Sequence, residues 1–441
     1  MNIEATKMST DHPVPIIGDV PSDDPRIVAL GLEPAVSTAA LYRNVDRIKD
    51  LLRAEAPKGD AMGRTTPLAG RAMRDAGIFA MQFPKSRGGI GISLPDQTVL
   101  LSRLARIDGG TCWTGMILSN SGSYAAQLSD EGYKDLFPTV DMPTSFSIAL
   151  RNAALDDGDS IVLRKGSVWD FGSGIYHAER FLGAARLVDG EGKPSLDADG
   201  HAQAAAVFIP PEKVRILHNW NPMGIRSSGS SSYGVDEDVR VPKKHSFPLF
   251  PMRSNPDAAP NAKHPETGFM SIYGVAVGIA QHALDLAIAS VRNATTRFNA
   301  PPSSLALTNI DRMVSEVNAI AWSVRGMMMY FQNAVETPGR MLTDEELEMT
   351  MSCGTPIRDA LNRVIDLAMD IYGTAWQIDP NSEIRRVIGD AAVLRGHMLY
   401  RPALNAQDAH TWGRGRKLIE NPDAATTILD TPWELWIPRG Q

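Results

Sequence analysis

The sequence predicts an α+β fold, mainly helical, because the spacing of its apolar residues changes twice along the 441 residues. Apolar residues recur at helical spacing in the first part of the chain, form short or alternating runs in the middle, and return to helical spacing in the last part. The changes predict a mobile leader, an N-terminal helical domain, a β domain, and a helical bundle with a tail, over 1–23, 24–142, 143–251 and 252–441.

The composition is that of a soluble globular enzyme, with 43% hydrophobic and 22% charged residues. A net charge of -7 and the absence of a long basic block give no reason to expect nucleic acid or an anionic membrane as a partner. Cys112 and Cys353 are the only cysteines and lie far apart, which favours a reduced, cytoplasmic protein without a zinc site. The N-terminus is polar and acidic and lacks the apolar core of a signal peptide, and we expect no membrane span.

Two strongly periodic stretches predict helices in the N-terminal domain, at Ala39 to Leu52 and at Val99 to Ile107. The segment from Phe83 to Gly91 lies between them. Pro84 stops a helix and the glycines of this segment permit a sharp turn, so we expect a loop here.

The middle of the chain carries four runs that predict strands, at 160–164, 181–185, 205–209 and 235–241. Acidic and glycine-containing turns separate them. The one biased stretch, Ser227 to Ser232, has the composition of a flexible linker, but apolar and strand-like residues flank it on both sides.

The last part of the chain predicts four long helices, at 268–297, 310–335, 344–376 and 383–400, with Gly354 to Pro356 interrupting the third. The apolar run Met327 to Phe331 is too short to span a membrane, and we expect it in the bundle core or at a subunit interface.

Five local patterns occur in the order typical of the acyl-CoA dehydrogenase family, which the chain resembles over nearly its whole length. They are Phe83 to Gly91, Gly109 to Trp113, Trp169 to Gly174, Trp220 to Pro242 and Gly278 to Asp285. The resemblance implies an acyl-CoA dehydrogenase-like fold, with an N-terminal helical domain, a central β-barrel or sandwich, and a C-terminal four-helix bundle. It also implies a homotetramer.

The catalytic base of that family is missing from both of its usual positions. Met398 stands where many members keep a glutamate, and a thioether cannot accept a proton from carbon. The alternative position, on the first bundle helix, falls at Gly268 or Phe269, although Glu266 lies close by. Loss of a general base typically costs a rate factor of about 100 to 10,000, so an ordinary dehydrogenase is not expected.

His397 is the leading candidate for acid-base work, because an imidazole exchanges protons near neutral pH. A lone histidine on a helix is more often a structural residue than a catalyst. With Asp390, however, it resembles a D-x-x-x-x-x-x-H element of the flavin-dependent monooxygenases that share this fold. The resemblance implies that His397 lies over the flavin at the substrate.

The same resemblance implies further site residues. A serine near the flavin N5 would make Ser173 catalytic, and Asn120 or Ser121 replaces a histidine that activates phenols in relatives. We therefore expect a substrate that needs no such activation, such as an amine, a sulfur compound or an electron-rich ring. The expected cofactor-binding residues are Trp169, Phe171, Ser173, Gly174, Arg226, Arg292, Arg297 and Gly373.

The resemblance implies the oxygenase component of a two-component flavin-dependent monooxygenase. Reduced FAD or FMN, supplied by a separate NAD(P)H:flavin reductase, would react with O2 to a C4a-hydroperoxyflavin that oxidises a small organic substrate. No nucleotide-binding G-x-G-x-x-G motif precedes a helix, as expected if the reductase handles NAD(P)H. Two alternatives remain, namely a dehydrogenase or oxidase with a non-standard base, and a non-catalytic scaffold.

Overall fold

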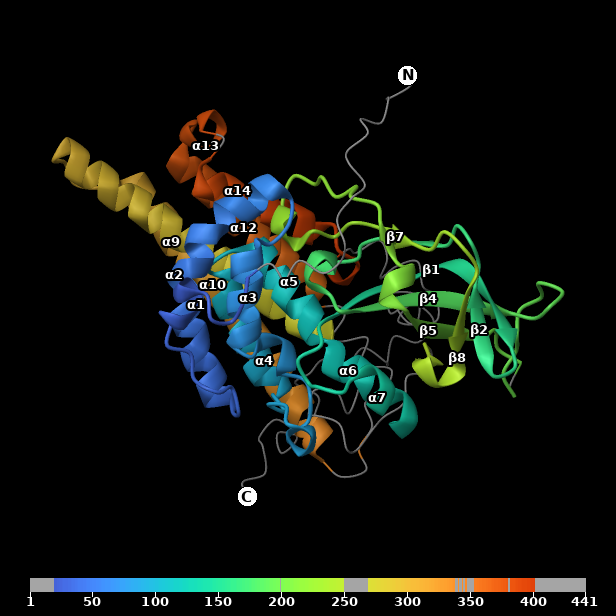
Figure 1. Ribbon diagram of the computed structural model, residues 1–441. Coiled ribbons are helices and arrows are strands. Elements are labelled where there is room, and N and C mark those ends of the chain that lie inside the picture. Colours follow the sequence, from blue (N-terminus) through green and yellow to red (C-terminus); the bar gives the residue numbers. More distant parts are fainter. Residues whose placement is uncertain are drawn as a thin grey trace, which may run out of the picture.

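The computed structural model describes residues 20–198, 200–249, 269–337, 340, 343, 346, 353–379 and 381–400 (Figure 1). Most of the expected leader lies outside these residues, as do Glu266 and Gly268. The helices and strands that are described confirm the expected α+β, mainly helical fold.

Seven helices form the N-terminal part of the chain. Serine, threonine or aspartate caps six of them by accepting a backbone N–H of the first turn, which satisfies one otherwise unpaired donor. The loop expected at Phe83 to Gly91 contains a short 3-10 turn, Lys85–Arg87. The helices are α1 Pro25–Val28, α2 Thr38–Met62, α3 Pro67–Asp75, α4 Leu94–Ala105, α5 Gly109–Ser119, α6 Ser121–Ala125 and α7 Asp130–Leu136.

The strands follow and form two sheets, one of six strands in the order β8-β2-β1-β4-β5-β9 and one of three in the order β3-β7-β6. Their bounds are β1 Thr144–Asp157, β2 Ser160–Leu163, β3 Val168–Trp169, β4 Arg180–Val188, β5 Ala204–Ile209, β6 Arg215–Ile216, β7 Tyr233–Gly234, β8 Val239–Pro242 and β9 Ser246–Pro248. Strand β1 was missed by the sequence analysis although it is the longest strand. It pairs in parallel with β4, and its register shifts between Ser147 and Asn152. Phe146, Ile148 and Leu150 alternate with small residues in its first half, as is typical of a strand.

The motif from Trp169 to Gly174, for which the family resemblance implies a strand, is mostly not one. Only Val168–Trp169 is a strand, and the chain then turns at Phe171, whose φ of 62° is unusual for a bulky residue. Of the expected run at 235–241, only Val239 to Val241 lie in a strand, β8.

The bundle contains α9 Ile272–Phe298, α10 Ser304–Glu336, α12 Gly354–Tyr372, α13 Ala375–Ile378 and α14 Glu383–Arg395. Gly354 to Pro356 form the first turn of α12, where a proline loses no hydrogen bond. Most of the expected third helix before Cys353 lies outside the described residues, so the interruption stays a prediction. The last helix ends at Arg395, so His397 lies just beyond it, before the 3-10 turn Met398–Tyr400. Helix α9 is apolar and long enough to cross a membrane, but 56% of its apolar window is buried inside the protein.

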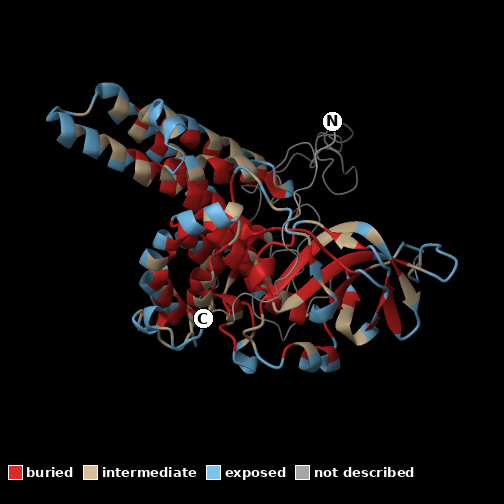
Figure 2. Ribbon diagram, turned by 45° about the horizontal axis from the view of Figure 1, so that its top comes forward, coloured by how far each residue is buried: buried red, intermediate tan, exposed pale blue. Residues whose placement is uncertain are grey.

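The buried residues are continuous from the N-terminal helices to the bundle, and Figure 2 places them where the helices meet the sheet. Helices α4 and α9 approach closely because glycines face the partner backbone. A Cβ on Gly274 would lie 2.3 Å from the Thr98 carbonyl oxygen, and one on Gly278 would lie 2.3 Å from that of Ser102. The expected boundaries near 142 and 251 fall between described elements, and the division into three domains stays a prediction.

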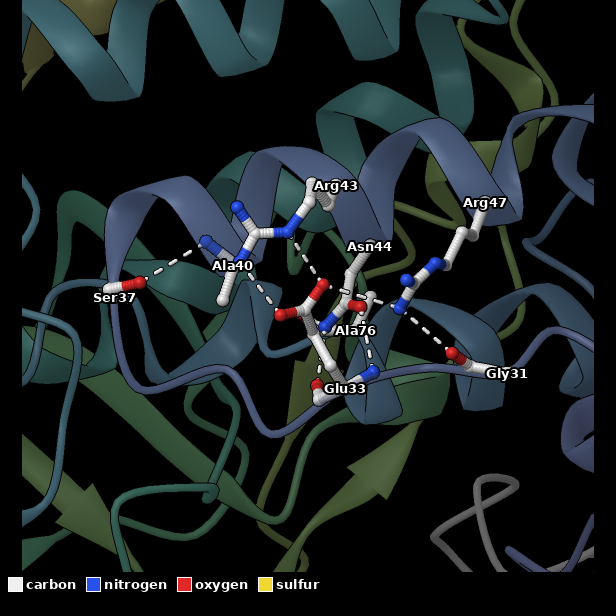
Figure 3. Close-up of polar contacts among 8 residues, drawn as sticks. All are labelled: Gly31, Glu33, Ser37, Ala40, Arg43, Asn44, Arg47 and Ala76. Atoms are coloured by element: carbon white, nitrogen blue, oxygen red, sulfur yellow. Dashed lines mark hydrogen bonds and ion pairs between the residues drawn. The ribbon is translucent and has the colours of Figure 1, made fainter.

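Asn44, on α2, fastens the segment that leads into this helix (Figure 3). Its side-chain oxygen accepts the N–H of Glu33 at 3.0 Å, and its NH2 group donates to the carbonyls of Glu33 at 2.8 Å and Ala76 at 3.3 Å. The side chain is fully buried. Nearby, Arg43 makes an exposed ion pair with Glu33.

Asn44→Ala should lower the free energy of unfolding of the N-terminal region by about 1–3 kcal/mol, because it leaves a buried N–H and two carbonyls without their partner. The thermal unfolding midpoint measures this. Arg43→Ala is the control and should cost less than about 1 kcal/mol, because exposed ion pairs contribute little. Equal losses in the two variants would contradict the role given to the buried amide.

Candidate active site

The serine-rich run, defined as Ser227, Ser228, Ser230, Ser231 and Ser232, is not a linker. All five side chains are buried, with exposed fractions of at most 5%. Buried hydroxyls need hydrogen-bond partners, so this segment must be built into a polar network. It forms a 3-10 turn, Arg226–Ser228, and then runs into β7.

A chain of hydroxyls connects this run to Ser173. The Oγ atoms of Ser228 and Ser230 lie 2.7 Å apart, and those of Ser230 and Ser173 lie 2.8 Å apart. The indole Nε1 of Trp113 donates to Ser173 Oγ at 3.1 Å. Because an indole N–H can only donate, Ser173 accepts this bond, and its own proton remains available to Ser230 or to a ligand.

Trp113 also contacts His397, and the two ring centroids lie 5.3 Å apart in an edge-on arrangement. Ser173, which follows β3, and His397, which follows α14, thus contact the same indole from α5. The structure brings together the two residues that the sequence put forward first.

Burial lowers the pKa of His397 to about 4, so the ring is neutral at pH 7. Its Nδ1 accepts the N–H of Leu399 at 3.4 Å, a long bond that favours the tautomer with the proton on Nε2. His397 can therefore donate a hydrogen bond from Nε2 without carrying a charge.

Ser227 fixes the start of the serine-rich run to the N-terminal domain. Its carbonyl accepts the hydroxyls of Thr65 at 2.8 Å and Thr114 at 3.2 Å, and its Oγ donates to Asp108 at 3.1 Å. A Cβ on Gly110 would lie 2.2 Å from Ser227 Oγ, so the run lies directly against the first turn of α5.

Large apolar side chains on the neighbouring segments are exposed. Phe171, Met223 and Met398 are 63%, 70% and 49% exposed, and Phe171 lies edge-on to Trp220 with centroids 6.4 Å apart. Exposed aromatic and thioether groups beside aligned hydroxyls suit a flat, mostly apolar ring with polar edges.

Trp169 is placed differently from its neighbour Phe171. Its indole is fully buried in the β domain, stacks on Tyr233 and donates to the carbonyl of Ala184 at 2.9 Å. These contacts hold the sheets together. Gly174 has a φ of 70°, and its N–H donates to the Ser228 carbonyl at 2.7 Å, so it joins the Ser173 turn to the serine-rich run.

The guanidinium of Arg226 donates hydrogen bonds to the protein itself. Nε donates to the Asp60 carbonyl at 3.0 Å, and Nη1 donates to Asn221 Oδ1 and the Pro222 carbonyl, both at 2.9 Å. Its expected role at a flavin or anion stays a prediction.

Asn120 ends α5 and lies in a buried amide network. Its Oδ1 accepts from Gln82 Nε2 at 2.7 Å, and Gln82 in turn accepts from Ser123. The neighbouring Ser121 accepts the N–H of Thr144 at 2.8 Å. Neither residue offers a group that removes a proton near neutral pH.

Three expected cofactor residues lie apart from Ser173 within the described part of the chain. Arg292 and Arg297 are exposed near the end of α9, which extends away from the sheets (Figure 1). Gly373 ends α12 with a φ of 55°. The expectation for the two arginines concerned the flavin of a neighbouring subunit, and it stays a prediction.

Sequence reasoning missed Trp113, Ser228 and Ser230 as site residues. The motif from Gly109 to Trp113 was recognised, but nothing in one sequence shows where an indole N–H points. Two other buried histidines have partners elsewhere, since His282 pairs with Glu383 at 3.0 Å and His177 with the Thr65 carbonyl at 2.9 Å. Among the described residues no group of three or more His, Cys, Asp or Glu is placed to hold a metal ion.

Known proteins resemble this chain in sequence over most of its length. The oxygenase component of p-hydroxyphenylacetate 3-hydroxylase from Acinetobacter baumannii is 23% identical over 389 residues, covering 82% of this chain and 86% of that protein. HsaA from Rhodococcus jostii, the oxygenase subunit of a flavin-dependent monooxygenase, is 26% identical over 297 residues, covering 64% and 74%. A putative acyl-CoA dehydrogenase from Bacillus subtilis is 23% identical over 367 residues, covering 78% and 89%. No protein-family model matches the chain.

Solved structures share the fold. XiaF from a Streptomyces species, in complex with FADH2 and glycerol, superimposes with a TM-score of 0.76 at 17% identity, covering 88% of this chain and 98% of that one. KijD3, solved with FMN and a dTDP-sugar, gives 0.72 at 19% identity, covering 89% and 96%. The resemblance to flavin-dependent oxygenase components and the acyl-CoA dehydrogenase-like fold are therefore both confirmed.

The ring of His397 should titrate with a pKa near 4, well below the ordinary 6.5, because burial disfavours its charged form. Since the folded pKa lies below the unfolded one, the folded state loses stability relative to the unfolded chain as the pH falls from 6.5 towards 4. NMR of ring-labelled histidine, assigned with His397→Gln, measures the titration. A midpoint at 6 or above would contradict the buried, neutral imidazole.

Proposed function

We propose that this chain is the oxygenase component of a two-component flavin-dependent monooxygenase, which uses reduced flavin and O2 to oxidise a small organic substrate. The observation that carries the proposal is the meeting of His397, Trp113 and Ser173, each from a different part of the fold. The curated relatives described as oxygenase components support the same function.

Phe171 and Ser173 would hold the flavin, and His397 would face it. Phe171 offers an exposed ring, Ser173 offers a hydroxyl whose proton Trp113 does not use, and His397 offers a neutral N–H. When bound, reduced flavin would supply the activation of oxygen. The proposal covers FAD and FMN, because one structural neighbour holds each.

The residues of this chain would orient the flavin and donate hydrogen bonds to it. The hydroxyl chain can be ordered with Ser228 donating to Ser230 and Ser230 donating to Ser173, which leaves the Ser173 proton free to donate to the flavin edge. His397 would donate from Nε2, and its low pKa keeps a positive charge out of the site at neutral pH. Fixed donors of this kind need no reorganisation during the reaction.

The residues at the end of α5 indicate the class of substrate. Asn120 and Ser121 are held in hydrogen bonds and cannot deprotonate a phenol at neutral pH. We therefore propose a substrate that is nucleophilic without deprotonation, such as an amine, a sulfur compound or an already electron-rich ring. A separate NAD(P)H:flavin reductase would be the partner, and the cytoplasm the location.

His397→Ala should leave flavin affinity unchanged and lower the product formed per reduced flavin on the order of 100-fold, the usual size of a lost proton donor. The measurement is stopped-flow mixing of anaerobic protein and reduced flavin with O2 and a candidate substrate, followed by product analysis. His201→Ala, which removes an exposed histidine far along the β domain, is the control.

The same experiment on the unchanged protein tests the function. A transient absorbance that belongs neither to reduced nor to oxidised flavin is the expected result. Flavin reduction by an organic substrate without oxygen would instead indicate a dehydrogenase or oxidase, and failure to bind flavin in either redox state would indicate a non-catalytic scaffold.

We further propose a homotetramer assembled through the bundle. Helices α9 and α10 extend beyond the body of the protein (Figure 2), and large apolar side chains on them are exposed, with Phe298, Leu305 and Trp322 at 70%, 71% and 72%. Apolar area of this kind on long helices is typical of subunit contacts.

Trp322→Glu should shift the protein towards smaller species in sedimentation velocity, because a carboxylate at a packed interface loses its hydration. Val36→Glu, an equally exposed apolar position on the N-terminal part, is the control and should leave the assembly intact. A wild-type protein that sediments as a monomer would contradict the proposal.

A further inference from the structure

Asp390 is a buried carboxyl that the proposed chemistry does not use. It lies on α14 and is only 4% exposed. Its Oδ1 accepts the backbone N–H of Ile225 at 2.5 Å. A Cβ on Gly109 would lie 2.5 Å from Asp390 Oδ2, so the carboxyl is enclosed between the first turn of α5 and the segment that precedes the serine-rich run.

The segment and α14 are in direct backbone contact. A Cβ on Gly389 would lie 2.5 Å from the Met223 carbonyl oxygen, and one on Gly224 would lie 1.9 Å from the Gly389 carbonyl carbon. Two glycines thus allow the approach that brings the Ile225 N–H to the Asp390 carboxyl.

Ile225 has a backbone conformation that its side chain disfavours. Its φ is 49° and its ψ is 32°, in the left-handed region, which a β-branched residue rarely adopts. Such a conformation persists only where the surroundings enforce it, and strained residues of this kind are concentrated at functional sites. The hydrogen bond to Asp390 is one of the contacts that enforce it.

A short series of hydrogen bonds connects Ile225 to Ser173. The Ile225 carbonyl accepts the N–H of Ser228 at 3.1 Å, and the Ser228 carbonyl accepts the N–H of Gly174 at 2.7 Å. The Ser228 hydroxyl begins the chain through Ser230 to Ser173. A displacement of Ile225 would therefore move the hydroxyl that Trp113 contacts.

We propose that Asp390 is a positioning residue, which holds Ile225 in its left-handed conformation and thereby sets the Ser173 hydroxyl for the flavin. The identity of the ligand, a flavin, rests on the proposed function. The contacts between Asp390, Ile225 and Ser173 do not depend on it.

The role requires an acceptor oxygen rather than a charge. Burial raises the pKa of Asp390 well above its ordinary value, and the nearby Asp108 and Asp60 carboxylates act in the same direction, against the Ile225 N–H and Arg386. A protonated carboxyl still accepts through its carbonyl oxygen. Asparagine has nearly the same shape and keeps that oxygen, whereas leucine has a similar volume and lacks it.

The indole N–H of Trp113 reports on the Ser173 hydroxyl without any flavin or turnover. The chain has eight tryptophans, so indole signals in an amide NMR spectrum of the full-length protein are few, and Trp113→Phe assigns the one needed. Asp390→Leu should shift this signal, and Asp390→Asn should leave it in place. Asp285→Leu is the control, because Asp285 makes an exposed ion pair with Arg106 between α4 and α9.

A second comparison tests whether the effect passes through Ile225. Glycine adopts positive φ without strain, so in an Ile225→Gly background Asp390→Leu should shift the Trp113 signal less than it does alone. With reduced flavin and substrate, Asp390→Leu should lower product formed per flavin about 10- to 100-fold, as expected for a displaced catalytic group, and Asp390→Asn should stay within a few-fold of the unchanged protein.

An unchanged Trp113 signal in folded Asp390→Leu would overturn the proposal, as would a signal in Asp390→Asn that moves as far as in Asp390→Leu. If Asp390→Leu does not fold, Asp390→Ala replaces it, and Asp390→Asn still decides, because a changed signal there contradicts the acceptor role. A shifted signal together with a protein that transfers no oxygen would support the positioning role and contradict only the proposed function.

Discussion

The burial of five serine hydroxyls at the junction of helices and sheet is the constraint on which the rest of the site depends. A buried hydroxyl without a partner is costly, so every element around the serine-rich run must present a donor or acceptor to it. Thr65, Thr114 and Asp108 do so from the N-terminal helices, Ser173 from the β domain, and Asp390, through Ile225, from the bundle. One short segment therefore fixes three parts of the chain relative to each other.

This arrangement explains why the site is polar in its interior and apolar at its edge. The hydroxyls point inward and are hydrogen-bonded, while Phe171, Met223 and Met398 are left exposed. A ligand held there would meet few donors, each in a fixed direction, beside a broad apolar surface. Neutral His397 completes the set, because a charged imidazole would be poorly solvated at this position.

The order of the elements could be predicted from the sequence, because helical and strand periodicities persist over long stretches such as α9 and α10. Strand β1 was not predicted, although Phe146, Ile148 and Leu150 alternate with small residues along its first half. Its register shift against β4, between Ser147 and Asn152, has no signal in the sequence. The serine-rich run resembled a linker because composition does not reveal burial. His397 and Ser173 could be identified only by family resemblance, and Trp113, which joins them, depends on the direction of one indole N–H. Contacts between residues far apart in the chain, such as Asp390 with Ile225, leave no periodic signal.

The central claim is that reduced flavin binds where Trp113, Ser173 and His397 meet. A crystal structure of the full chain grown anaerobically with reduced flavin tests it most directly. The account predicts that the flavin ring lies against Phe171, with the Ser173 hydroxyl within hydrogen-bond distance of its edge and the His397 ring facing it. A flavin bound elsewhere, or a ring turned away from Ser173 and His397, would contradict the account.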